Sequence, residues 1–112
     1  MRFLFSLFLS LVTVYTLTIR VSFGQGIDLD AGEQVFSQNC TACHAGGENS
    51  VNPVKTLKLE ALNKYTKDSI EAIKSQIQNG AGPMPAFADR LSDEEISNVA
   101  HFVLNQAKNN VW

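Results

Sequence analysis

Both cysteines of the chain and one of its two histidines fall within five residues, Cys-Thr-Ala-Cys-His at positions 40–44. The pattern Cys-x-x-Cys-His is the attachment signature of c-type haem. Each thiol adds across one vinyl group of the porphyrin, and the two-residue gap lets Cys40 and Cys43 reach both vinyl groups on one edge. His44 follows directly and is then held beneath the iron as the proximal ligand. The motif therefore predicts one covalently bound haem c.

Three other interpretations of this motif are open. A thioredoxin-like redox pair needs a βαβ context, and no segment of the chain alternates as a strand would. A zinc site needs a fourth ligand and usually a second Cys/His pair, which the sequence lacks. A local disulfide between Cys40 and Cys43 would leave His44 without a role. Covalent haem is the interpretation that uses all three residues.

The second axial ligand of the iron decides between electron transfer and catalysis, because an open position can bind oxygen or peroxide. Met1 lies in the N-terminal leader, so the candidates are Met84 and His101. Met84 stands between two prolines, which restrict the backbone and can present the sulfur at little ordering cost. His101 lies off the apolar stripe of its predicted helix, as a solvent-facing histidine does. We predict Met84 as the ligand, since the His/Met pair is typical of electron carriers.

Helices must position these residues, because the patterned segments have helical and not strand period. The first helix is predicted to open at Asp30, with Asp30 and Glu33 at capping-box spacing, and to lead into Cys40. Gly32 within it would allow another helix to cross closely. A short helix is predicted at 57–65, and residues 45–56 and 80–87 are predicted loops.

Two further helices complete the prediction. Asp68 is expected to cap a helix that ends at Gly80. The last helix is predicted to begin with a capping box at 92–95. Its apolar stripe comprises Ile96, Val99, Ala100, Val103 and Ala107. The fold class predicted is all-α, a small domain of about four helices around one haem.

The first 26 residues have the pattern of a cleaved signal peptide. Arg2 precedes an uncharged run at 3–19, and small residues allow cleavage after Gly24 or Gly26. An uncleaved membrane anchor is the alternative, although the run is at the short end for spanning a bilayer. We expect residues 27–112 to be the mature domain.

The composition of the mature domain limits its partners and its stability. Seven Lys and Arg against eleven Asp and Glu give a formal charge of −4, which argues against nucleic acid and anionic lipid. A domain of 86 residues has a poor ratio of core to surface. Small exported domains usually add a disulfide, a metal or a cofactor, and two cysteines allow at most one disulfide.

With these features in place, the chain resembles a class I c-type cytochrome and, more narrowly, the cytochrome c6 family. The resemblance covers essentially all of residues 27–112. It rests on DLDAGEQVFSQNCTACHAGGENSVNP, QIQNGAGPMPAF, DRLSDEEI and the C-terminal Trp112. Cytochrome c6 is the soluble carrier of cyanobacteria and algal plastids, and CHAGG and MPAF separate it from respiratory relatives. The resemblance implies a mostly monomeric electron-transfer protein, not an enzyme.

The resemblance also implies partners and a compartment. The family carries one electron from the cytochrome b6-f complex to photosystem I in the thylakoid lumen. A respiratory carrier that donates to a terminal oxidase is one alternative. The other is a haem enzyme or gas sensor, in which Met84 is merely structural and the iron binds carbon monoxide readily.

The resemblance assigns roles to individual residues as well. It matches Cys40 and Cys43 to the thioether cysteines, and His44 and Met84 to the proximal and distal ligands.

Three further residues are matched around this site. The carbonyl of Pro53 stands where the family accepts a hydrogen bond from the proximal imidazole. Gln76 matches a glutamine that approaches the haem near the methionine and helps set the potential. Arg90 matches an arginine that docks photosystem I near the haem edge. Pro83 departs from the family, which commonly has a small non-proline residue there, and Phe87 is expected to pack beside the haem.

Overall fold

The computed structural model describes residues 2–11 and 26–112 of the chain. Residues 2–11 are helical, within the segment predicted as a signal peptide. Most of that segment lies outside the described residues, including the predicted cleavage position after Gly24, so the predicted mature boundary stays a prediction. None of the helices in the described ranges is long and apolar enough to cross a membrane.

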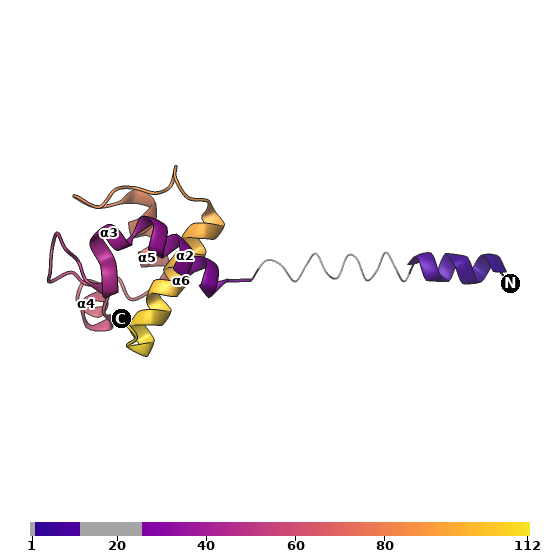
Figure 1. The fold of residues 1–112 in the computed structure, drawn as a ribbon, viewed down its shortest axis with the longest axis horizontal. Coiled ribbons are helices and arrows are strands. Elements are labelled where there is room, and N and C mark those ends of the chain that lie inside the picture. Colours follow the sequence, from indigo (N-terminus) through magenta and orange to yellow (C-terminus); the bar gives the residue numbers. More distant parts are fainter. Residues whose placement is uncertain (1, 12–25) are drawn as a thin grey trace.

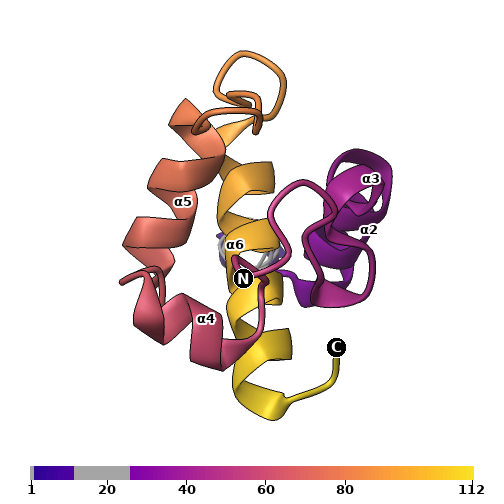
Figure 2. The same ribbon diagram turned by 90° about the vertical axis from the view of Figure 1, so that its left-hand side faces the viewer.

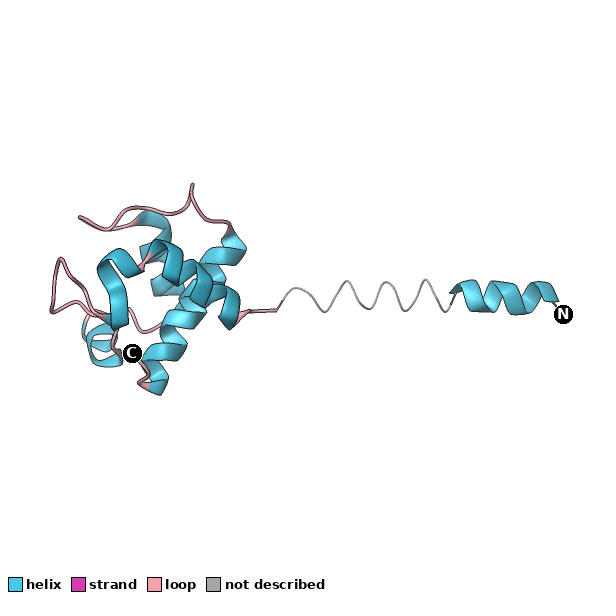
Figure 3. Cartoon of the chain, in the orientation of Figure 1, coloured by secondary structure: helices cyan, strands magenta, loops and turns pink. Residues whose placement is uncertain are grey.

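The described part of the domain is built from helices and loops (Figure 3). In chain order the helices are α2 (Leu29–Asn39), α3 (Thr41–His44), the 3-10 turn η1 (Ala45–Gly47), α4 (Leu59–Lys64), α5 (Ile70–Asn79) and α6 (Asp93–Asn109). The one β-type pairing among these residues is an isolated bridge between Ala81 and Met84. The all-α prediction is confirmed.

The long C-terminal helix α6 is the centre of the domain (Figure 1). Figure 2 shows α2 and α3 on one side of α6, and α4 and α5 on the other. The predicted stripe of α6 is buried: Ile96, Val99, Ala100, Val103 and Ala107 are each at most 5% exposed. Val35 and Phe36 of α2, Leu62 of α4 and Ile73 and Ile77 of α5 complete much of the core.

The crossing of α2 over α6 requires a glycine. A Cβ built at Gly32 would lie 2.3 Å from the backbone oxygen of Asn98, so the two helix backbones are in direct contact. Asn98 is itself buried, and its side-chain oxygen accepts a hydrogen bond from the backbone of Asp28 at 3.1 Å. The close crossing predicted at Gly32 is confirmed.

Two predicted helix starts are displaced by one or two residues. The N-cap of α2 is Asp28, whose carboxylate accepts from the backbone N–H of Ala31, and not Asp30. The N-cap of α5 is Ser69 and not Asp68. In both places two neighbouring residues could cap, and the packing of the helix decides between them. The capping box of Ser92 and Glu95 is confirmed.

Candidate haem-binding site

The two cysteines lie at the junction between α2 and α3. The backbone N–H of Cys40 still donates to Phe36 in α2, at 2.9 Å, while its carbonyl accepts from His44 at the same distance. Cys40 is half-buried against the core and Cys43 is exposed, and both are free thiols. Burial raises the pKa of the Cys40 thiol to about 11. Cys40 is therefore protonated at neutral pH, and its thiol is not poised for disulfide exchange.

The imidazole of His44 is fixed by one hydrogen bond. Its Nδ1 lies 2.9 Å from the backbone oxygen of Glu48. A carbonyl can only accept, so Nδ1 carries the proton and Nε2 has the free lone pair. Nε2 is thus the nitrogen able to coordinate iron, and the Nδ1 bond orients the ring for that role.

This acceptor differs from the one predicted, the carbonyl of Pro53. The chain turns sharply after His44 because Gly46 and Gly47 both have left-handed backbones, with φ of 62° and 75°. This turn brings the carbonyl of Glu48, four residues beyond the histidine, back to the ring. Pro53 lies in the exposed part of the following loop. Every residue has a backbone carbonyl, so the residue type does not reveal which carbonyl accepts the bond. In the sequence, only the two glycines indicate the turn that places it.

The methionine loop projects from the C-terminal end of α5. Gly80 ends that helix with φ of 66° and ψ of −177°. Reciprocal backbone hydrogen bonds between Ala81 and Met84, at 3.0 and 3.1 Å, then close a tight turn. Met84 is half-buried and packs against the edge of the core.

Gln76, which the resemblance places near the haem and the methionine, contacts the sulfur of Met84 in the structure. Its side-chain nitrogen Nε2 donates to Met84 Sδ at 3.6 Å. Gln76 is in the last part of α5 and Met84 is eight residues further on, so the helix and the turn after it bring the two together. The amide can lower the electron density on the sulfur while leaving another lone pair for a metal.

Phe87 and Arg90 follow the methionine loop. Phe87 is buried, with 6% of its surface exposed, and its backbone N–H donates to Ile77 of α5. The guanidinium carbon of Arg90 lies 5.5 Å from the centre of the Phe87 ring, and Arg90 is exposed. Its side chain is held against the domain with its charge facing solvent.

His101 belongs to α6 and is tied to its own helix. Its Nδ1 lies 2.8 Å from the backbone oxygen of Ser97, and the residue is half-buried. Within residues 2–11 and 26–112, no three His, Cys, Asp or Glu side chains gather in a way that could hold a metal ion.

The donor set fits a haem. A porphyrin supplies four nitrogen ligands to its iron, so the protein has to add one or two axial donors. His44 Nε2 is a nitrogen donor in the required tautomer, and Met84 is a half-buried thioether on a constrained loop. Cys40 and Cys43 are unpaired thiols directly before the histidine.

Comparison with known proteins gives consistent results. Residues 27–103 match the family model described as cytochrome c oxidase, cbb3-type, subunit III. Cytochrome c6 of Gracilaria tenuistipitata var. liui is 50% identical over 109 residues, which cover 97% of this chain and 98% of that relative. Cytochrome c6 of Bryopsis maxima is 58% identical over 80 residues, or 70% of this chain and 91% of that one.

A solved structure agrees with these relatives. The cytochrome c6 of the diatom Phaeodactylum tricornutum superposes with a TM-score of 0.73 at 52% identity, covering 76% of this chain and 99% of that one. The helical fold and the Cys-x-x-Cys-His site thus define a small class I c-type cytochrome, with one covalently bound haem c. The chain belongs to the cytochrome c6 family. It is accordingly an electron-transfer protein and not an enzyme.

Proposed function

We propose that residues 27–112, released from a cleaved signal peptide, carry one electron from the cytochrome b6-f complex to photosystem I in the thylakoid lumen. The mature form is a soluble and mostly monomeric protein. Cys40 and Cys43 hold the haem through thioether bonds, and His44 and Met84 are its axial ligands. The names of the relatives support this assignment.

The observation that carries the proposal is the way both axial candidates are held. The carbonyl of Glu48 orients the ring of His44, and the amide of Gln76 contacts the sulfur of Met84. The haem supplies the redox change between ferric and ferrous iron. If both ligands stay bound in each state, little of the protein has to move, and electron transfer is fast. Filled axial positions also exclude oxygen and peroxide.

Met84 can be tested as the ligand by optical spectroscopy of the mature protein. The oxidised protein should have the weak red absorption band of Met–Fe(III) ligation, and Met84→Ala should lose it and bind carbon monoxide when reduced. His101→Asn is the control and should keep the band. Absence of the band from the unmutated protein, with carbon monoxide binding gained in reduced His101→Asn but not in Met84→Ala, would assign the ligand to His101 instead. Carbon monoxide binding to the unmutated protein would favour the enzyme or sensor alternative.

Arg90 is the proposed docking residue for photosystem I. It is an exposed cation packed on Phe87, shortly after the methionine loop, in a domain of net negative charge. Such a charge can steer encounter with a partner.

The partner can be tested by mixing the reduced protein with photosystem I and following haem oxidation after a flash. Arg90→Gln should slow the oxidation by about tenfold at low salt. Lys108→Gln also removes one positive charge, but at the last turn of α6 and not beside the methionine loop. It should therefore leave the oxidation rate nearly unchanged. No fast oxidation, or equal rates in both variants, would contradict this docking role. Rapid oxidation by a terminal oxidase alone would favour the respiratory role, which the matched oxidase-subunit family suggests.

A further inference from the structure

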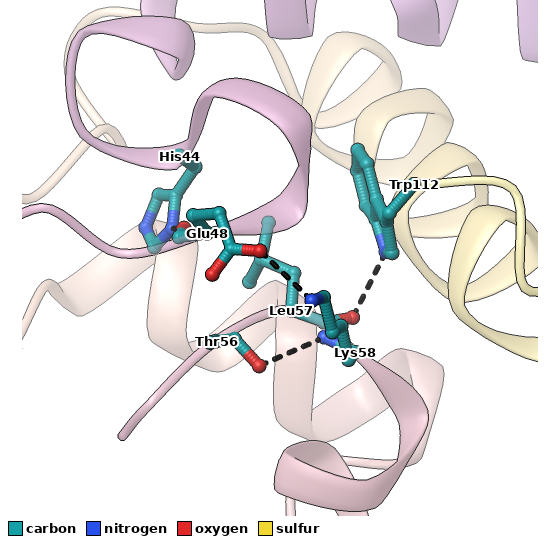
Figure 4. A network of polar contacts seen from close by, with 6 residues as sticks. All are labelled: His44, Glu48, Thr56, Leu57, Lys58 and Trp112. Carbon is teal, nitrogen blue, oxygen red and sulfur yellow. Dashed lines mark hydrogen bonds and ion pairs between the residues drawn. The ribbon is translucent and has the colours of Figure 1, made fainter. Parts of the chain in front are cut away.

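The segment from His44 to Lys58 forms a loop that is closed at its base, and Figure 4 draws the contacts of Glu48 with Lys58 and of Leu57 with Trp112 at this base. The backbone N–H of Leu57 donates to the carbonyl of Gly47 at 2.8 Å. Next to this bond, Lys58 Nζ lies 2.8 Å from a carboxylate oxygen of Glu48. The residue that orients His44 through its backbone, Glu48, is therefore also held through its side chain.

The C-terminal residue Trp112 covers this base from the other side. Its indole N–H donates to the carbonyl of Leu57 at 3.0 Å, across 55 positions of the sequence. A Cβ built at Gly47 would lie 2.4 Å from the Trp112 ring, so the indole is in direct contact with the Gly47 backbone. The ring also packs against Phe36 and Phe102, with centroids 5.3 and 6.0 Å away.

Trp112 therefore contacts both of the chain segments that meet at the loop base. It packs on Gly47 and bonds to Leu57, and Gly47 directly precedes the residue whose carbonyl accepts from His44. The exposed ion pair of Glu48 and Lys58 adds a weaker restraint, since both side chains are more than half exposed. The aromatic contacts of Trp112, which follows the end of α6, fix its ring against Phe36 of α2 and Phe102 of α6.

We propose that Trp112, assisted by the Lys58–Glu48 ion pair, is a positioning residue for the proximal ligand His44. It holds the carbonyl of Glu48 under Nδ1 and so sets the basicity of the imidazole, and with it the reduction potential. This inference rests on the proposed ligation of iron by His44. A strong bond from Nδ1–H to a carbonyl makes Nε2 a better donor, which favours ferric iron. Loosening the loop base should therefore raise the potential.

The test uses the mature protein with its haem and the variant Trp112→Phe. Phenylalanine keeps an aromatic ring against Phe36, Phe102 and Gly47 but lacks the indole N–H. The midpoint potential should rise, and the Nδ1 proton of His44, followed by NMR in the reduced state, should exchange faster with solvent. Val103→Ala is the control, because it removes buried atoms from α6 and lowers stability without touching the loop base.

Charge variants test the ion pair separately. Lys58→Gln and Lys55→Gln each remove one positive charge, which alone lowers the potential. Loss of positioning acts in the opposite direction, so Lys58→Gln should have the higher potential of the two. The reversed pair, Glu48→Lys with Lys58→Glu, should restore the slow exchange of the Nδ1 proton.

Two results would overturn the inference while leaving the proposed function intact. One is a normal cytochrome spectrum with unchanged potential and proton exchange in Trp112→Phe. The other is an equal shift in Val103→Ala, which would make Trp112 a stabilising residue only. A mature protein without covalent haem or without the Met–Fe(III) band would instead refute the proposed ligation, and the positioning role with it.

Discussion

The contact between Gln76 and Met84 would let one side chain adjust the proposed axial ligand. The amide N–H of Gln76 withdraws electron density from the sulfur at a distance of 3.6 Å. A weaker sulfur donor stabilises ferric iron less, because ferric iron has the greater need for donated charge. The contact between Gln76 and Met84 is therefore expected to raise the reduction potential.

Replacing Gln76 by valine tests this effect. Gln76→Val removes the donor and should lower the midpoint potential by about 20–60 mV, if the bond is worth about 0.5–1.5 kcal/mol. The measurement is a redox titration of the haem band. Gln78→Val, two residues along the same helix, is the control. A potential that rises or stays constant in Gln76→Val would show that the contact does not tune the sulfur.

The proposed site follows from the sequence where one residue type carries the chemistry. Cys40, Cys43 and His44 form a motif, and Met84, the single methionine of residues 27–112, stands between two prolines. The acceptor of the His44 bond could not be predicted, because it is a backbone carbonyl placed by a turn. The hydrogen bond from Trp112 to Leu57 could not be predicted either, because it joins positions 55 residues apart.

Helices α2 and α6 cross so closely that a glycine is needed at position 32. The added methyl group of Gly32→Ala would lie 2.3 Å from the Asn98 oxygen and 3.0 Å from the Phe102 Cβ, so α2 would have to shift. We expect a loss of about 1–3 kcal/mol in the free energy of unfolding, measured by denaturant titration. Gln34→Ala, at an exposed position of α2, should cost little. An unchanged free energy of unfolding in Gly32→Ala would show that α2 can shift away from α6 at little energetic cost.

The methionine loop depends on a glycine in the same way. Gly80 has φ of 66° with an extended ψ, and an added Cβ would lie 2.5 Å from the carbonyl of Met84. Gly80→Ala should therefore displace the loop and weaken or abolish the Met–Fe(III) band. Gly82→Ala is a matched control, because Gly82 also has positive φ, 54°, but has nothing within 4 Å of its added Cβ. Similar spectra for the two variants would argue that strain at Gly80 does not determine ligation.

Helix existence was easier to predict than the exact ends of helices. The stripe of α6 has a helical period over three turns, and all its members are buried. At the starts of α2 and α5, two candidate caps stand within one or two positions of each other. Which of them caps depends on tertiary contacts, such as the bond from Asp28 to Asn98, and these are not visible in the local pattern.

For the whole molecule, the haem is expected to supply stability that the chain lacks. The domain has 86 residues, and hydrophobic residues at the edge of its core, among them Leu57, Leu59, Ile70 and Met84, are only partly buried by protein. A haem bound through Cys40 would cover apolar surface that otherwise contacts water. The bound group stabilises the folded state because the unfolded chain cannot hold it in the same way.

Haem removal should therefore destabilise the fold as a unit. The mature chain made without haem should lose on the order of 5 kcal/mol of unfolding free energy, which is comparable to the total stability of a small domain. Circular dichroism should then show reduced helix content and a broad thermal transition, against a sharp one in the haem-bound protein. Equal helix content and equal midpoints in the two forms would show that the domain of residues 27–112 is stable without haem. The haem would in that case add little to the stability, which would come from the apolar core that α6 forms with α2, α4 and α5.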